Sequence, residues 1–166
     1  MATREQSMKF PNTLGGLQTI IDTLQRYLGA QLLNTGGLAI KTGGSALAKT
    51  VNTVYFMIDG QVYSKAAADM AALSGTVTNA KFNVFVFGVN SAGTLTTQMG
   101  TEAATLGGVT FPTIADGVVP IGFVIINPTG TGNFVGGTTA LDDATVVPNA
   151  VYVNTVAPFS PGVYSV

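Results

Sequence analysis

The chain has 166 residues, enough for one hydrophobic core of ordinary size, and only 9% of them are charged, against about 25% in a typical soluble domain. Its net charge is −1 and its seven basic residues are scattered over residues 4–81 without a cluster, which excludes the basic surface of a nucleic-acid-binding protein. Cysteine, histidine and tryptophan are absent, which excludes disulfides, thiolate metal sites and histidine-based acid–base catalysis. A surface with so few charges favours association with other subunits.

Residues 1–34 are predicted to form an extended arm followed by one short amphipathic helix. The arm, residues 1–13, contains Arg4 and Lys9 and ends near Phe10-Pro11, where proline holds the backbone extended. The apolar residues that follow recur at alternating spacings of three and four, which places them on one stripe of a helix: Leu14, Leu17, Ile21, Leu24 and Leu28. Two interpretations of the helix remain open, packing on its own domain and contact with a neighbouring subunit.

The first half of a predicted β-domain, residues 35–156, contains the clearest hairpin in the chain. Residues 51–58 and 61–65 are rich in β-branched and aromatic residues and flank Asp59-Gly60. This dipeptide favours a type I′ turn, in which both central residues have positive φ. A short strand is predicted at residues 38–41, between two Thr-Gly-Gly sequences, and one or two helical turns in the alanine-rich residues 66–73.

Residues 81–89, with the sequence Lys-Phe-Asn-Val-Phe-Val-Phe-Gly-Val, are predicted to form the central strand. Its alternate positions are apolar on both faces, so both faces must be covered. A turn at residues 90–93 and a return strand at 94–99 complete a second hairpin. Residues 118–126 are also apolar on both faces and are the predicted neighbour of the central strand.

Shorter elements complete the predicted domain. Pro112 limits residues 109–114 to an edge strand at most. Further strands are predicted at residues 134–135, 145–147 and 151–156, and an extended tail at 157–166, which contains Pro158 and Pro161. The fold class is therefore predicted as all-β, a β-sandwich or barrel behind an N-terminal extended arm and one short amphipathic helix.

No arrangement of reactive residues predicts an enzyme. Serine residues have no histidine base, and the adjacent Asp142 and Asp143 are predicted as a solvated turn, with a weak calcium site as the alternative. The sequence Gly130-Thr131-Gly132 begins like a phosphate-binding loop but has Val135 in place of the third glycine, which favours a simple turn. We expect no catalytic residues, no cofactor and no metal.

The sequence also predicts no membrane partner. The first ten residues lack the apolar core of a signal peptide. The longest apolar run, residues 118–126, is interrupted by Pro120 and Gly122 and is too short to span a bilayer. We expect a protein that is made in the cytoplasm and is soluble within an assembly.

Four segments of the second half resemble virion structural proteins of tailed bacteriophages. They read Phe-Val-Phe-Gly-Val-Asn-Ser-Ala-Gly-Thr-Leu at residues 85–95, Gln-Met-Gly-Thr-Glu-Ala at 98–103, Pro-Ile-Gly-Phe-Val-Ile-Ile at 120–126, and Phe-Val-Gly-Gly-Thr-Thr-Ala-Leu-Asp at 134–142. The similarity covers about residues 50–147 and is greatest to proteins that decorate or cement the capsid. It implies a β-rich, commonly oligomeric protein bound outside a shell of major capsid protein.

The function expected from this resemblance is capsid decoration on the virion surface, by a protein made in the host cytoplasm. The expected partners are the major capsid protein and the chain itself, as a homotrimer. The candidate contacts to capsid or subunit are residues of the arm and of the helix stripe: Arg4, Lys9, Phe10, Pro11, Leu17, Ile21, Leu24 and Leu28. The alternative function is a head-fibre, tail or adhesin subunit that binds a host-surface ligand. The arm has an alternative too, which is that it frays in solvent.

Overall fold

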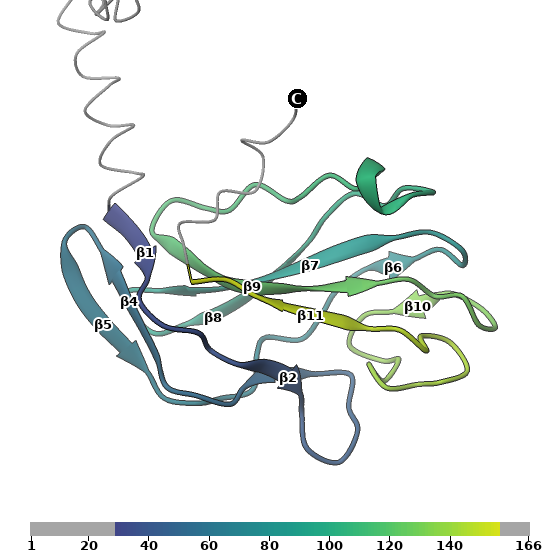
Figure 1. Ribbon diagram of the computed structural model, residues 1–166, viewed down its shortest axis with the longest axis horizontal. Coiled ribbons are helices and arrows are strands. Elements are labelled where there is room, and N and C mark those ends of the chain that lie inside the picture. The colour runs from purple at the N-terminus through teal and green to yellow at the C-terminus, as the bar shows by residue number, and fades with distance from the viewer. Residues whose placement is uncertain (1–28, 157–166) are drawn as a thin grey trace, which may run out of the picture.

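The computed structural model describes residues 29–156, and these residues form a β-sandwich (Figure 1). The first sheet has the order β11-β9-β7-β8, and the second has the order β1-β4-β5. β1 and β4 lie against β9, so the two sheets pack face to face. The bounds are, for the first sheet, β7 (Asn83–Asn90), β8 (Leu95–Met99), β9 (Val118–Ile126) and β11 (Val151–Asn154), and, for the second, β1 (Ala30–Leu32), β4 (Val54–Ile58) and β5 (Gln61–Lys65). The all-β prediction is confirmed.

Two smaller antiparallel sheets close the sandwich. β2 (Leu38–Ile40) pairs with β3 (Ala48–Thr50), and β6 (Thr76–Val77) pairs with β10 (Phe134–Val135). A 3-10 turn, η2 (Leu106–Gly108), lies in the long connection between β8 and β9. Within residues 29–156 these strands pair antiparallel throughout, as expected for a chain of hairpins and short returns.

β7 is the central strand, as the sequence predicts. It pairs with β9 along one edge and with β8 along the other, and seven of its eight residues are buried. Phe85, Phe87 and Val89 face the core between the sheets, whereas Val84 and Val86 face the other side of their sheet. At roughly 1.5–3 kcal/mol for each large apolar side chain buried, β7 is a main source of the free energy of folding.

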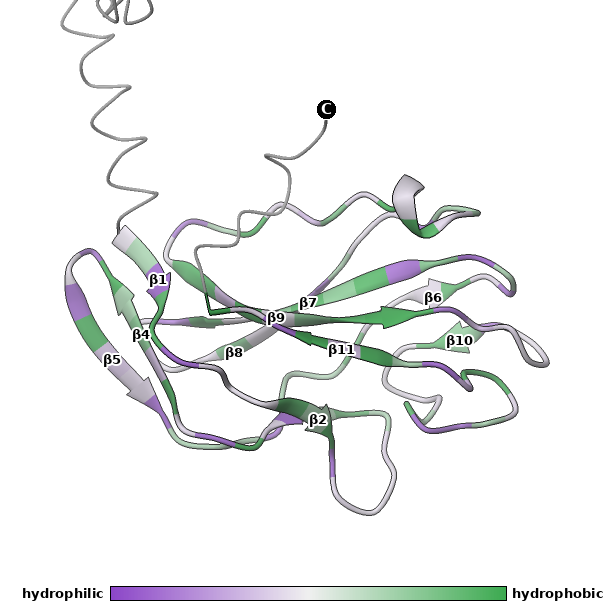
Figure 2. Cartoon of the chain, viewed as in Figure 1, coloured by the Kyte–Doolittle hydropathy of each residue, from purple (hydrophilic) through white to green (hydrophobic). Residues whose placement is uncertain are grey.

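The core between the sheets is filled from both sheets and from the loops at their ends. Figure 2 shows strongly hydrophobic residues along β9, among other strands. The buried apolar side chains of this core are Leu32, Leu38, Ala48, Val54, Phe56, Ile58, Met70, Leu73, Val77, Phe85, Phe87, Val89, Val119, Ile121, Val124, Ile126, Phe134, Leu141 and Val147.

A bulge in β9 explains how a strand containing Pro120 and Gly122 lies in the middle of a sheet. Phe87 pairs with Gly122 and Gly88 pairs with Pro120, so Ile121 is the extra residue. The bulge shifts the alternation of β9, and it lets Ile121 point into the core together with Val124. Proline is tolerated at this point because the ladder of hydrogen bonds is already interrupted.

Both predicted hairpins are confirmed. β4 and β5 are joined by Asp59 and Gly60, with φ of 50° and 78°, the positive values that a type I′ turn requires. In the turn between β7 and β8, the Asn90 side chain accepts a hydrogen bond from the backbone N–H of Thr94 at 2.9 Å. Gly93 has a φ of 74°, which glycine adopts without steric cost.

Several local predictions are wrong. Residues 66–73 form no helix, because the backbone N–H groups of Met70 and Thr50 donate instead to Ala48 and Ala68 carbonyls. Burial of Met70 and Leu73 in the core also favours an extended path. Residues 145–147 form no strand. Residues 109–114, which Pro112 limits to an edge strand at most, contribute one isolated bridge, between Thr110 and Thr101. The structure adds β1, β3 and β6, and β1 lies within residues 1–34, for which the sequence predicts only an arm and a helix.

The arm and helix predicted at residues 1–28 and the tail predicted at 157–166 lie outside the described residues.

Truncation of Phe85 tests the central position of β7. Its ring is fully buried and contacts the Phe134 ring edge-on, with 5.9 Å between the centroids. Phe85→Ala should lower the free energy of unfolding by about 3–5 kcal/mol, through lost burial and a residual cavity. Phe85→Asp should prevent soluble folding, because the buried charge has no partner. Tyr55→Ala, at a side chain that is 49% exposed, is the control and should change stability by less than about 1 kcal/mol. Equal effects of Phe85→Ala and Tyr55→Ala in urea unfolding would contradict the fold.

Candidate functional site

The contact residues predicted from the sequence all lie before the described part of the chain. This holds for Arg4, Lys9, Phe10 and Pro11 of the arm and for Leu17, Ile21, Leu24 and Leu28 of the helix stripe. The structure brings none of them together, and their roles stay predictions. The candidate surfaces below are therefore built from residues 29–156.

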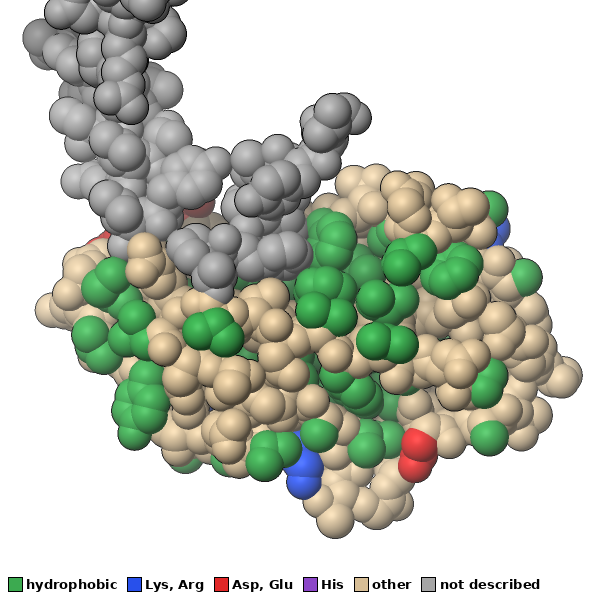
Figure 3. Space-filling view, in the orientation of Figure 1, with side chains coloured by type: hydrophobic (Ala, Val, Ile, Leu, Met, Phe, Trp, Pro, Cys, Tyr) green, Lys and Arg blue, Asp and Glu red, His purple; other side chains and the backbone are tan. Residues whose placement is uncertain are grey.

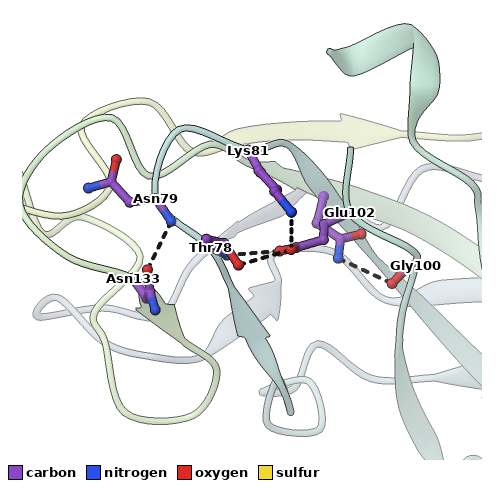
Figure 4. Close-up of polar contacts among 7 residues, drawn as sticks. Thr78, Asn79, Lys81, Gly100, Glu102 and Asn133 are labelled. Carbon is purple, nitrogen blue, oxygen red and sulfur yellow. Dashed lines mark hydrogen bonds and ion pairs between the residues drawn. The ribbon is translucent and has the colours of Figure 1, made fainter. Parts of the chain in front are cut away.

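The most connected polar group is the Glu102 cluster, defined as Thr78, Lys81 and Glu102 (Figure 4). One carboxylate oxygen of Glu102 accepts hydrogen bonds from the Lys81 ammonium at 3.0 Å and from the Thr78 hydroxyl at 2.9 Å. The other oxygen accepts from the Thr78 backbone N–H at 2.8 Å. The cluster fastens the segment between β6 and β7 to the chain that follows β8.

These contacts decide the chemistry of Glu102. The backbone N–H of Thr78, the Lys81 ammonium and the Thr78 hydroxyl, in that order, lower the pKa of the Glu102 carboxyl from 4.5 to about 2. The carboxylate is therefore ionised at neutral pH, and both of its oxygens already have partners. Because a general base or a metal ligand needs an oxygen that faces a substrate or an ion, the cluster is structural.

The glycine-rich sequence at residues 130–132 is a turn, as predicted. The backbone N–H of Thr131 donates to the Thr145 carbonyl at 2.7 Å, and the Gly130 carbonyl accepts from the Asn79 side chain at 2.9 Å. A Cβ on Gly130 would lie 1.6 Å from the Thr145 oxygen, so only glycine fits there. These groups hold two loops together and do not form a cradle for phosphate.

The two adjacent aspartates also lie in a turn. One carboxylate oxygen of Asp143 accepts the backbone N–H groups of Thr145 at 2.8 Å and Val146 at 3.2 Å, and Asp142 is exposed. Within residues 29–156 no three side chains of metal-ligating type lie together. Burial and the nearby negative charge of Asp142 raise the pKa of Tyr152 to about 12, so this phenol stays protonated at neutral pH.

The outer face of the sheet β1-β4-β5 carries exposed apolar side chains. We call this surface the hairpin face and define it by Leu33, Tyr55, Met57 and Val62. Tyr55 and Met57 alternate with the buried residues of β4, and Val62 of β5 lies opposite Met57. Leu33, Tyr55 and Val62 are 46%, 49% and 64% exposed. A contiguous group of exposed apolar side chains on a surface with few charges is typical of a protein contact.

The outer face of the four-stranded sheet is also apolar, and part of it is hollow. The segment after β8 crosses this face, where Phe111 packs edge-on against Phe123 of β9 with 5.0 Å between the ring centroids. Beside this pair lies a hollow of about 210 Å³, lined by Val84, Leu106, Val109, Phe111, Phe123 and Ile125. Figure 3 shows apolar side chains gathered over this part of the molecule.

Sequence reasoning missed both faces. Along β4, inward-facing and outward-facing positions alternate, and the Asp59-Gly60 turn fixes the register of the hairpin. These two features together are enough to predict that Tyr55 and Met57 lie on the outer face. The hollow had no such signature, because the path of residues 101–111 across the sheet is set by tertiary contacts.

No protein-family model, no curated protein and no solved structure matches this chain. Within residues 29–156, no helix has the length and apolar character that crossing a bilayer requires.

Acid unfolding tests the Glu102 cluster. A carboxyl whose pKa is lowered on folding stabilises the folded state above its unfolded pKa, and this contribution is lost as the pH falls through its folded pKa. The wild-type protein should therefore be more stable than Glu102→Gln at pH 7, and the difference should shrink as the pH falls from about 4.5 to about 2. Urea unfolding of both proteins over this range measures it. A difference that stays constant with pH would show that the ionised carboxylate contributes nothing.

Proposed function

We propose that this protein is a structural virion protein that binds the outside of a bacteriophage capsid and stabilises it as a decoration protein. The observation that carries the proposal is the hairpin face, an exposed group of apolar side chains on a chain with only 9% charged residues. Covering a surface of this kind lowers its free energy, and a densely packed protein shell provides such a cover.

The order of the chain supports a capsid-facing role for the hairpin face. Residues 1–28 lead directly into β1, and β1 pairs with β4 of the hairpin face. The proposal gives the residues before β1 and the hairpin face the same neighbour. We assign the Phe10 side chain to a pocket on that neighbour and Arg4 and Lys9 to its carboxylates, since buried aromatics supply affinity and charges at the rim supply orientation.

Three of the four segments that carry the resemblance to phage proteins lie in the four-stranded sheet or continue from it. Residues 85–103 include most of β7 and all of β8, residues 120–126 lie in β9, and residues 134–142 begin with β10. β7, β8 and β9 are neighbours in the same sheet, so the similar residues are those that set the framework of the domain.

A decoration protein of this kind stabilises the capsid through the surface area that each copy buries and through the number of copies bound. A standard protein interface buries about 800 Å² on each partner, and each copy spanning a joint between capsid subunits adds such an area to the shell. Many copies act together, because each contact raises the effective concentration of the next one when a subunit bridges two sites. No chemical step is needed in this mechanism.

Binding to undecorated capsids tests the proposal. The protein lacking residues 1–11, and the double variant Tyr55→Ser with Val62→Ser, should each bind about tenfold to thirtyfold more weakly, since removing one central anchor costs about 2 kcal/mol. Melting temperatures should stay close to that of the wild type. Val135→Ser, at an exposed side chain on β10, is the matched control and should bind normally. Failure of the wild-type protein to bind capsids, with binding to host cells instead, would favour the head-fibre, tail or adhesin alternative.

The oligomeric state gives a second test. We expect a homotrimer, because a capsid offers local threefold positions and each charge-poor surface is stabilised by being covered. Sedimentation of the full chain at micromolar concentration should give the mass of three chains. A monomer in solution that is also a monomer on the particle would rule the trimer out.

A further inference from the structure

β5 forms one edge of its sheet, and its backbone groups are arranged regularly along that edge. Among the described residues, β5 pairs with β4 and with no other strand (Figure 1). The two-residue turn makes Ile58 and Gln61 a hydrogen-bonded pair, and hydrogen-bonded and non-hydrogen-bonded pairs alternate along an antiparallel ladder. Val62 and Ser64 therefore direct their N–H and C=O groups away from β4. Both residues are exposed.

Contacts on the other side of β4 agree with this alternation. The Tyr55 backbone N–H donates to the Asn34 side chain at 2.6 Å, and the Tyr55 carbonyl accepts from the Leu33 N–H at 2.8 Å. Because Tyr55 directs its backbone groups away from β5, its partner Ser64 directs its own groups away from β4. In the described part of the chain, the outward N–H groups of Val62 and Ser64 have no acceptor.

This edge is complementary to itself. In an antiparallel pairing centred on Tyr63, Val62 of one copy lies opposite Ser64 of the other, and both residues carry outward backbone groups. Such a pair exchanges two backbone hydrogen bonds, and a twofold axis through the centre repeats the pair. We infer that β5 binds β5 of a second copy of this chain in this register, which joins the two sheets into one.

The charges at the two ends of the hairpin favour the antiparallel direction. Asp59 lies at the turn and Lys65 at the other end of β5, and neither side chain forms an ion pair with another described residue. Antiparallel pairing brings the negative end of one hairpin beside the positive end of the other. It also places Lys65 opposite the uncharged Gln61. The Lys65 residues of the two copies are then four positions apart, roughly 14 Å, which exceeds the Debye length of about 8 Å at physiological salt.

The apolar side chains of the outer face gain from the same pairing. Val62 is 64% exposed and lies beside Met57 on the hairpin face. In the inferred register the outer sides of the two β5 strands adjoin, so the two hairpin faces become one continuous apolar surface. A surface of twice the area offers a larger neighbour a correspondingly larger contact.

The size of the contact sets its strength. β5 has five residues. Two strands of this length bury less than the roughly 800 Å² on each partner that a standard interface buries. We therefore expect the pairing to be weak in dilute solution and to form where copies are held close together. The inference does not depend on capsid binding or on the homotrimer, so each proposal can fail alone.

Cysteine trapping between two single variants tests the register. Because the chain has no cysteine, Val62→Cys and Ser64→Cys each contain one thiol, at an exposed edge position. The two full-length proteins, one with a mass tag, are mixed at about 1 mM, a concentration typical of tethered partners, and oxidised mildly. The mixed disulfide should exceed either self-disulfide about tenfold. Opposite Cα atoms lie about 5.5 Å apart, whereas like positions lie roughly 9 Å apart, beyond the limit of about 7 Å for a disulfide.

Tyr55→Cys mixed with Ser64→Cys is the control, because Tyr55 is exposed on the same face but lies one strand further from the edge. This pair should react at the level of random collision. Equal yields of mixed disulfide, self-disulfides and control disulfide overturn the inference, and so does a self-disulfide that exceeds the mixed one.

Hydrogen exchange tests the pairing without cysteine. Exchange of the Val62 and Ser64 amides should slow about tenfold as the wild-type protein is concentrated from about 10 μM to about 1 mM, while Tyr63, whose N–H faces β4, should not change. Ser64→Pro removes one outward N–H without removing a bond to β4, so it should abolish the slowing at Val62. Ser64→Ala, the matched control, should retain it.

Exchange at Val62 and Ser64 that is independent of protein concentration overturns the inference. Slowing that appears only when undecorated capsids are added overturns it too, because the partner of β5 is then a capsid protein and not a second copy.

Discussion

The burial of β7 on both faces is the constraint on which the rest of the molecule depends. A strand that carries Phe85 and Phe87 on one side and Val84 and Val86 on the other needs two separate coverings. The sheet β1-β4-β5 supplies the first and closes a conventional sandwich core. Among residues 29–156, the second includes the segment after β8, which crosses the sheet and packs Phe111 on β9. The two coverings are unequal, and the difference leaves the hollow.

Polar contacts hold the weaker covering in place. The backbone of Ala103 exchanges two hydrogen bonds with Phe82 immediately before β7, and the neighbouring Glu102 carboxylate binds Thr78 and Lys81. A loop alone has little hydrophobic surface with which to fix its path, so charge-assisted hydrogen bonds at one end of it set where it begins. This gives Glu102 a structural role although its side chain is about a quarter exposed.

Much of the framework was predictable from the sequence because it depends on local chemistry. Asp59-Gly60 sets one hairpin through positive φ, and the apolar residues of β7 and β9 identify the two interior strands. The predictions that failed concern features that depend on residues distant in the sequence. The alanine-rich residues 66–73 favour a helix by propensity, but their backbone groups pair with β3 and burial of Met70 and Leu73 overrides that preference. The bulge at Ile121 was equally invisible, because it exists only in the register with Phe87. Of the candidate surfaces, the hairpin face follows from the alternation of β4, whereas the hollow follows from no local pattern.

The two outer faces differ in a way that suits them to different occupants. The hollow lies between a sheet and a loop and is lined by apolar side chains alone. The hairpin face ends at β5, the edge strand of its sheet, with Val62 exposed beside Met57. An edge strand offers backbone hydrogen-bonding groups as well as side chains, and pairing or covering by another protein satisfies both. The hairpin face is therefore the surface on which the proposed attachment to a larger assembly should be sought.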